Sequence, residues 1–219
     1  MRILIVAATD TEIAPLLERM ISLPTGDLSV DCYSRGSHEI DVLITGVGMV
    51  ATAAWCSRAL AQTPYDLALN LGVCGSFDSF IEPGTVVHVV KDRLAELGAE
   101  DGDQFRTIED LQLPGQAEFV NFDPPSNPGI EQLPSVAGIT VNSVHGNERS
   151  IALVTGRFNP QVESMEGAAF MFACRLSGVP YAQVRAVSNA IERRNRGQWK
   201  VPEAIDALAT AARTILETV

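Results

Sequence analysis

Short apolar runs recur along the sequence, and several are followed by a segment with the residue spacing of a helix. A continuous apolar run is typical of a strand covered on both faces, as in a parallel sheet flanked by helices. The expected strands are residues 2–8, 39–45, 67–71, 84–91, 138–144 and 181–187. Because the chain has 219 residues and no linker-like break, the sequence predicts one α/β domain over residues 1–219.

The strand expected at residues 181–187 and the segment before it bring polar side chains near one another. The preceding segment is predicted to be a helix, with Glu163 and Glu166 three residues apart on one face. The strand itself is followed by Ser188 and Asn189. Ligands of parallel α/β sheets bind outside the carboxyl ends of the strands. We therefore expect a helix carboxylate and the Asn189 amide to face the same cleft.

The charge balance limits the class of ligand. The formal net charge is −11, whereas nucleic acids and anionic membranes are bound by basic surfaces, so neither is an expected partner. With 46% hydrophobic and 20% charged residues, the composition is typical of a globular enzyme. The first apolar run is too short for a signal peptide, and no run is long enough to span a membrane. We therefore expect a cytoplasmic protein.

The cysteines and histidines show no metal-binding pattern. Cys32, Cys56, Cys74 and Cys174 lack the close pairing that zinc sites use, and the three histidines are scattered. Cys56 and Cys174 fall in predicted helices, which favours reduced core residues. We expect neither a metal nor an organic cofactor.

Two roles are open for Glu12, which follows the first expected strand. Thr9 and Glu12 match a capping box, in which the carboxylate accepts a hydrogen bond from the backbone N–H of the cap residue. The residues alone favour this structural role over that of a catalytic acid. The two roles do not exclude each other.

The turn at Gly46 and Gly48 supplies a rival hypothesis, because Gly46-Val-Gly48-Met-Val-Ala51 matches a dinucleotide-binding fingerprint. That fingerprint needs an acidic residue at the end of the next strand, and Asp66 instead precedes its strand. Close packing of a helix on a strand is the simpler reading. A nucleotide-binding module without catalysis remains the alternative from a different class.

Two motifs carry a resemblance to a known family. Met165-Glu166-Gly167-Ala168, followed by Arg185-Ala-Val-Ser188-Asn189, resembles the purine nucleoside phosphorylase and nucleosidase superfamily. The fuller pattern of SMEGAA, RAVSN and ERRNRGQW is similar to that of the futalosine hydrolases, nucleosidases of menaquinone biosynthesis. The resemblance covers nearly the whole chain. It implies a three-layer sandwich, in which helices flank a twisted mixed sheet that is partly closed, and a homodimer or higher homo-oligomer.

The resemblance also implies roles for individual residues. As catalytic residues, Glu12 orients the attacking water and Asn189 meets the purine at N7 and O6. Glu166 binds the ribose 2′ and 3′ hydroxyls, and Met165 packs on the sugar. The remaining implied substrate-binding residues are Val73, Cys74, Gly75, His145, Arg193 and Arg194.

Departures from the superfamily pattern sharpen the expected reaction. The resemblance places an arginine and a serine, which hold phosphate in the superfamily's phosphorylases, where this chain has Asn70 and Val73. Water is therefore the expected co-substrate. Asn189 stands where adenosine-type nucleosidases have aspartate, which favours a 6-oxopurine such as hypoxanthine. Futalosine carries a carboxyphenyl ketone at its 5′ end, and Arg193, Arg194 or Arg196 is expected to bind its carboxylate. The alternative is that these arginines form a solvated turn without a ligand. Another purine nucleosidase or phosphorylase is the alternative.

The remaining segments are expected to be structural. Residues 92–134 are rich in Gly, Pro, Asp and Glu and predict a long irregular segment, either a flap over the site or a contact with a second subunit. Residues 150–156 predict a short apolar segment, and residues 201–219 an amphipathic helix. His88 is expected to be a strand residue without a functional role.

Overall fold

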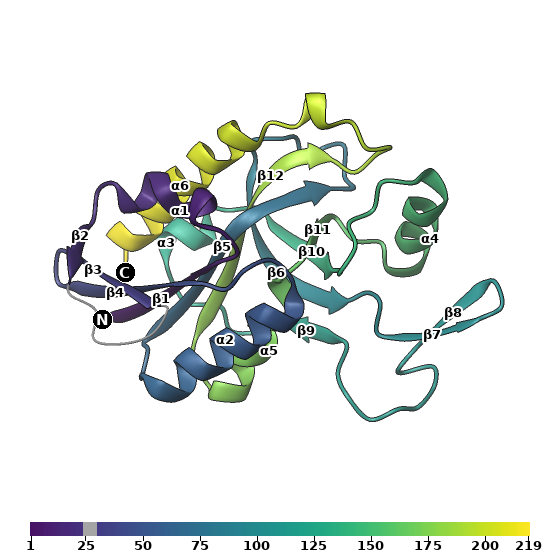
Figure 1. Ribbon diagram of the computed structural model, residues 1–219, viewed down its shortest axis with the longest axis horizontal. Helices are drawn as coiled ribbons and strands as arrows, with labels where there is room; N and C mark the ends of the chain where they lie inside the picture. The colour runs from purple at the N-terminus through teal and green to yellow at the C-terminus, as the bar shows by residue number, and fades with distance from the viewer. Residues whose placement is uncertain (24–29) are drawn as a thin grey trace.

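The computed structural model describes residues 1–23 and 30–219, and its centre is a mixed sheet of ten strands (Figure 1). In spatial order the strands are β11 (Val162–Ser164), β10 (Ser135–Thr140), β6 (Val86–Leu94), β12 (Tyr181–Ala190), β5 (Leu67–Ser76), β1 (Arg2–Ala7), β4 (His38–Ile44), β3 (Val30–Arg35) and β2 (Ile21–Leu23), with β9 (Glu118–Val120) beside β6. The central strands β12, β5, β1 and β4 are parallel. Because β11 also pairs with the end of β5, this half of the sheet curves back on itself.

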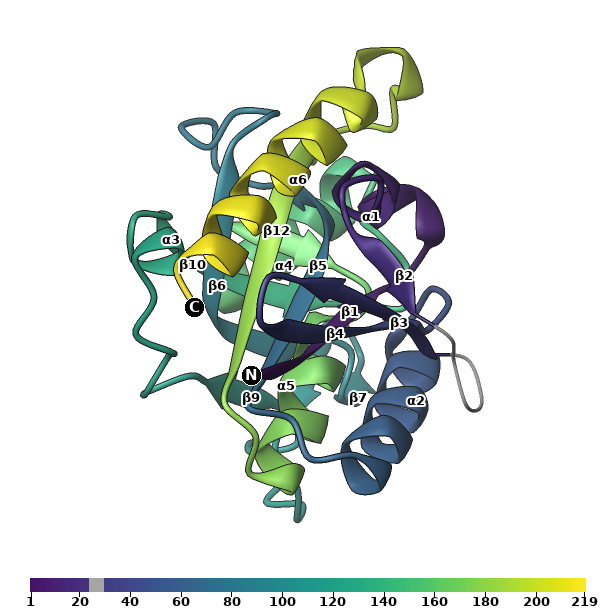
Figure 2. The same cartoon turned by 90° about the vertical axis from the view of Figure 1, so that its left-hand side faces the viewer.

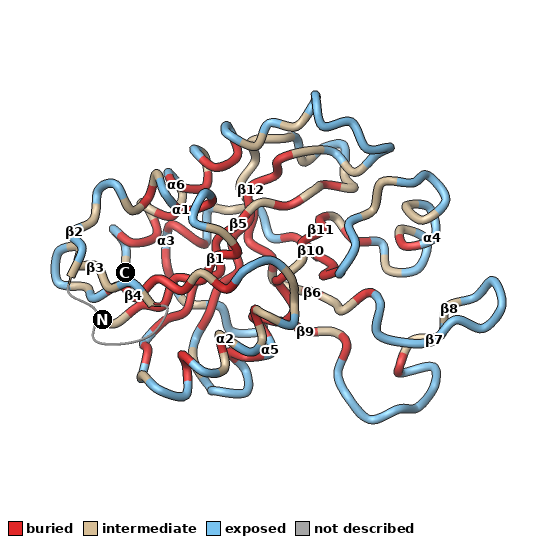
Figure 3. Tube along the Cα trace, viewed as in Figure 1, coloured by how far each residue is buried: buried red, intermediate tan, exposed pale blue. Residues whose placement is uncertain are grey.

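Helices cover both faces of the sheet (Figure 2). One layer contains α1 (Asp10–Leu17), α3 (Pro128–Glu131) and α6 (Val201–Glu217), and the other contains α2 (Met49–Gln62) and α5 (Gly167–Ser177). Each layer has its own apolar core against the sheet, with Ile13 and Leu208 in one and Cys56 and Phe170 in the other. The strands between them are the most deeply buried part of the chain (Figure 3). The predicted three-layer α/β sandwich is therefore confirmed.

The central strands run further than the sequence predicts. The strand expected at residues 67–71 continues as β5 to Ser76, so Gly72 and Gly75 lie within the strand. Likewise, β12 continues to Ala190, with an irregularity in its pairing to β5 between Val187 and Asn189. A bulge places one extra residue on its strand and breaks the strict alternation of side chains. Ser188 and Asn189, at this irregularity, both line the cavity described below.

The prediction that Glu163 and Glu166 lie on one helix is wrong. Glu163 lies in the short strand β11, and Glu166 is the residue that precedes α5. The strand forms because residues 162–164 pair with both β10 and β5. These pairings are long-range, so local helical spacing does not show them. Glu163 is consequently not a first-turn helix residue.

Two further segments differ from expectation. Residues 92–134 are not one irregular stretch: they contain the end of β6, the hairpin of β7 (Gly98–Asp101) and β8 (Gln104–Thr107), and then β9 and α3. The apolar residues at 150–156 belong to an α-helix, α4 (Glu148–Phe158), which begins at the cap residue Asn147. The β7–β8 hairpin projects away from the sheet, beyond α4 (Figure 1). The final helix is confirmed as α6.

Candidate active site

A cavity of about 310 Å³ lies at the carboxyl ends of the central parallel strands. This is the edge at which open α/β sheets bind their ligands. Among the described residues, its lining includes seven of the predicted site residues: Glu12, Val73, Cys74, Gly75, Met165, Glu166 and Asn189. The rest of its lining includes the apolar residues Val47, Trp199 and Ile205 and also Glu163.

Glu12 is both a helix-capping residue and a cavity residue. Its Oε2 accepts hydrogen bonds from the backbone N–H of Thr9 at 3.0 Å and from the Thr9 hydroxyl at 3.1 Å. Its Oε1 accepts a hydrogen bond from the backbone N–H of Val73, on β5, at 3.0 Å. The cap therefore fixes the carboxylate at the wall of the cavity, where one of its oxygens still has a free lone pair.

Glu166 forms a buried ion pair that the sequence does not reveal. Its Oε2 lies 3.4 Å from Nη1 of Arg185, and the Arg185 side chain is 1% exposed. Its Oε1 accepts a hydrogen bond from the backbone N–H of Gly48 at 3.1 Å. The Gly46–Gly48 turn thus holds a carboxylate of the protein itself, which removes the reason to read it as a nucleotide phosphate site. Each carboxylate oxygen retains capacity to accept another hydrogen bond.

Gly72 shows how closely Glu12 and Arg185 approach β5. A Cβ atom on Gly72 would lie 2.4 Å from Nη1 of Arg185 and 2.9 Å from Oε1 of Glu12. Any side chain there would displace one of these groups. The guanidinium group of Arg185 therefore lies near both carboxylates. A charged residue in the middle of the apolar run at 181–187 was the sequence signal that could have singled out Arg185.

The bulge in β12 determines the orientation of Asn189. The Ser188 hydroxyl lies 2.8 Å from Oδ1 of Asn189 and 3.1 Å from the carbonyl oxygen of Cys74. Nδ2 of Asn189 donates to the Ala190 carbonyl at 2.9 Å. Because the Nδ2 group carries two hydrogens and one donates to Ala190, the amide has a second N–H for a ligand. Cys74 beside it is a neutral thiol, because burial raises its pKa to about 12.

His145 and the arginine loop lie outside this cavity. Backbone N–H and ring Nδ1 of His145 both contact the buried Glu163 carboxylate, so this pair anchors the loop that precedes α4. His145, Asn189 and Arg194 line a smaller neighbouring cavity of about 30 Å³. The Arg194 guanidinium lies 5.5 Å from the centre of the Trp199 ring. Arg193 is exposed and lines neither cavity.

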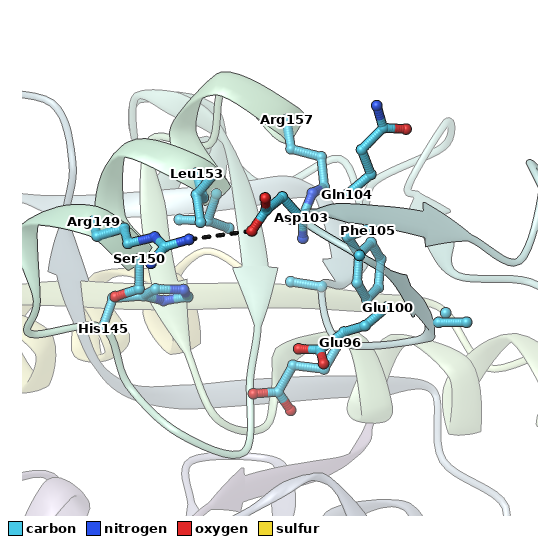
Figure 4. A pocket seen from close by; sticks show the side chains of 15 residues that line it. Glu96, Glu100, Asp103, Gln104, Phe105, His145, Arg149, Ser150, Leu153 and Arg157 are labelled. Atoms are coloured by element: carbon cyan, nitrogen blue, oxygen red, sulfur yellow. Dashed lines mark ion pairs between the residues drawn. The ribbon is translucent and has the colours of Figure 1, made fainter.

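A larger cavity of about 500 Å³ lies between the β7–β8 hairpin and α4 (Figure 4). Its charged side chains have both signs, and Arg149 forms an ion pair with Asp103 at 3.6 Å in which both side chains are highly exposed. Exposed ion pairs contribute little energy or orientation. We therefore place the candidate site at the strand ends, where the carboxylates are buried and held by several donors.

The described residues contain no group of three or more His, Cys, Asp or Glu side chains that is arranged to hold a metal ion. Cys56 lies in α2 and Cys174 in α5; both are buried free thiols, and burial raises the pKa of each. In the part of the chain that the structure describes, no helix is long and apolar enough to cross a membrane.

Comparison with known proteins agrees with this fold. Residues 2–219 match the Phosphorylase superfamily. The chain is 32% identical to the futalosine hydrolase of Thermus thermophilus over 80% of both chains, and 32% identical to that of Acidothermus cellulolyticus over 94% of this chain and 85% of that one. The S-adenosylhomocysteine nucleosidase of Streptococcus pyogenes, solved with 5-methylthiotubericidin, has the same fold: its TM-score is 0.80 at 22% identity, covering 99% of this chain and 96% of that one. The chain thus belongs to the Phosphorylase superfamily and, within it, to the futalosine hydrolase family.

Proposed function

We propose that the protein hydrolyses the N-glycosidic bond of futalosine, releasing hypoxanthine and dehypoxanthine futalosine. The observation that carries the proposal is the convergence of Glu12, Glu166 and Asn189 on one cavity at the ends of parallel strands. The identity to curated futalosine hydrolases over most of the chain supports the choice of substrate. No metal or organic cofactor takes part in this reaction.

The proposed chemistry divides among three side chains. The bond between C1′ and N9 breaks, its electron pair moves to the purine, and the ribosyl group acquires cationic character. Glu166 accepts hydrogen bonds from the ribose 2′ and 3′ hydroxyls, and Met165 packs on the sugar. The Asn189 amide donates to the purine as negative charge grows on it. Glu12 orients a water molecule and accepts its proton as the new C1′–O bond forms.

The site favours water over phosphate as the nucleophile. Asn70 is 1% exposed and is not among the described residues that line the cavity; its Nδ2 donates to the Val6 carbonyl at 3.0 Å and its Oδ1 accepts from Arg185. Val73 offers its backbone N–H, but this donates to Glu12. A phosphorylase needs cationic or hydroxyl donors for phosphate, and these two positions supply neither.

Cleavage of futalosine is therefore expected to be independent of phosphate. We expect the same rate of hypoxanthine release in phosphate and in a phosphate-free buffer. In water enriched with oxygen-18, mass spectrometry should find one heavy oxygen in the sugar product. A sugar 1-phosphate product would instead establish a phosphorylase, and failure to release hypoxanthine at all would refute the substrate assignment.

For the futalosine carboxylate, Arg194 is the best-placed member of the arginine loop, since it borders the small cavity that also contains Asn189. Arg194→Ala is expected to lower kcat/KM for futalosine by about ten- to a hundred-fold, as for the loss of a charged hydrogen bond. Inosine lacks the tail and should be affected less. Arg193→Ala is the matched control, because Arg193 is exposed on the same loop, as Arg194 is, but lines neither cavity. Equal effects of Arg194→Ala on both substrates would indicate a structural turn.

A role in menaquinone biosynthesis, a homo-oligomeric assembly and a cytoplasmic location are further parts of the proposal, and the family resemblance and composition support them. Val73, Cys74 and Gly75 are proposed to contact the nucleoside, since all three line the cavity. His145 is proposed to contact it from the smaller neighbouring cavity. The alternative function is that of another purine nucleosidase, such as one specific for 5′-methylthioadenosine or S-adenosylhomocysteine.

A further inference from the structure

A series of buried hydrogen bonds lies behind Glu166. It begins at Asp92 on β6, whose Oδ1 accepts from the Thr140 hydroxyl and whose Oδ2 accepts from Nε2 of Gln183, each at 3.0 Å. Oε1 of Gln183 accepts from Nε of Arg185 at 3.2 Å, and Arg185 in turn contacts Glu166. Asp92, Gln183 and Arg185 are each 1% exposed. These side chains connect the interior of the sheet to the cavity.

The direction of each hydrogen bond in this series is fixed by Asp92. Both oxygens of the Asp92 carboxyl group accept hydrogen bonds, from the Thr140 hydroxyl and from Nε2 of Gln183, and burial raises its pKa to about 6. The NH₂ group of Gln183 must therefore point towards Asp92 and its carbonyl oxygen towards Arg185. A guanidinium group has only donors, so the opposite amide orientation would leave Arg185 facing another donor. Asp92 thus keeps the carbonyl oxygen of Gln183 turned towards Arg185, where it accepts a hydrogen bond from Nε.

The same pair of side chains also touches the backbone beside Glu166. A Cβ atom on Gly167 would lie 2.1 Å from Oε1 of Gln183 and 2.2 Å from Oδ2 of Asp92. Only glycine fits there without displacing the pair. The start of α5 therefore rests directly on Asp92 and Gln183. Glu166 is held through its side chain by Arg185 and through its backbone by this contact.

We propose that Asp92 and Gln183 are positioning residues for the carboxylate that binds ribose. They hold the Arg185 guanidinium and the start of α5, and these hold Glu166 in the orientation that accepts the ribose hydroxyls. The inference rests on the proposed function, in which Glu166 binds the ribose. Asp92 and Gln183 are not among the described residues that line the 310 Å³ cavity, so they act through their neighbours.

The test compares futalosine with its 2′-deoxy analogue, which lacks one hydroxyl that Glu166 binds. Wild type is expected to prefer futalosine in kcat/KM. Asp92→Asn reverses one of the two acceptors of the carboxylate, and Gln183→Leu removes the hydrogen bonds of the amide to Asp92 and Arg185. Each is expected to reduce the preference by about ten- to a hundred-fold, as for a misplaced binding group. Gly167→Ala should have the same effect, because its methyl group would displace the side chains of Asp92 and Gln183.

His88→Leu is the matched control for damage to the core. His88 lies on the same strand as Asp92, is 3% exposed, and pairs with Val184, so its side chain is on the opposite face from Gln183 and Arg185. It is expected to shift the melting temperature and to keep the wild-type substrate preference. A positioning role is overturned if the Asp92 and Gln183 variants slow both substrates equally, as a merely structural defect would.

Glu166→Gln separates this inference from the proposed function. If Glu166→Gln abolishes the preference while Asp92→Asn and Gln183→Leu keep it, the positioning role is wrong and the ribose role of Glu166 stands. If Glu166→Gln has the wild-type preference, the ribose role itself is wrong. If all three variants lose the preference and His88→Leu keeps it, the inference is supported.

Discussion

Glu12→Gln is expected to lower kcat for futalosine by about a hundred- to ten-thousand-fold, the usual effect of removing a positioned general base. The amide keeps an oxygen that can accept from the Val73 backbone N–H, so the side chain should stay at the cavity wall. It has no basic oxygen to take the proton of the attacking water. The measurement is steady-state hypoxanthine release, combined with thermal melting of the same preparation.

A control for capping is available at α4. The Asn147 side chain caps this helix by accepting from the backbone N–H groups of Arg149 and Ser150, and it is not among the lining residues of the 310 Å³ cavity. Asn147→Ala should cost about 0.5–2 kcal/mol of stability and leave turnover unchanged. If Glu12→Gln behaves in the same way, Glu12 is only a helix cap and another group must activate water.

Asn189→Asp is expected to reverse the choice of purine. A 6-oxopurine presents acceptors at N7 and O6, and the amide of Asn189 has an N–H available for them. An ionised aspartate would place a negative charge against both acceptors, and against the Ala190 carbonyl as well. Sites built around buried hydrogen bonds discriminate by about ten-thousand-fold or more. Wild type should therefore cleave futalosine far better than its 6-amino analogue.

The measured quantity is the ratio of kcat/KM for the two nucleosides in each protein. Asn189→Asp should lose futalosine activity and gain activity towards the amino analogue, because a protonated carboxyl can both donate to N7 and accept from the exocyclic amine. Asn189→Ala is the control: it should lose futalosine activity without that gain. A wild type that prefers the 6-aminopurine would show that Asn189 does not read the base.

The sequence predicts the central layers well because their signals are local. The run at residues 181–187 contains enough β-branched and apolar side chains to identify a buried strand, and the spacing of Leu208, Ala212 and Leu216 identifies α6. Glu12 was also correctly identified as a capping residue. In each case, the pattern that reveals the element lies within the element itself.

The errors occur where distant parts of the chain decide the structure. Glu163 has helical spacing with Glu166, yet its strand exists because β10 and β5 are available to pair with it. The ion pair between Glu166 and Arg185 joins residues 19 positions apart, and Asp92 and Gln183 are 91 apart. No local periodicity predicts such contacts. The sequence therefore identifies the carboxylates of the candidate site but not the residues that hold them.

The arrangement of side chains along β12 has a consequence for how the family can diversify. Gln183 and Arg185 lie in the fully buried part of the strand, whereas Asn189 lies past the bulge and is partly exposed. In the proposed reaction, a substitution past the bulge would change hydrogen bonding to the base without disturbing the contact between Arg185 and Glu166. If Asn189 reads the base as proposed, base choice can be changed at the strand end while the buried contacts of Gln183 and Arg185 are kept.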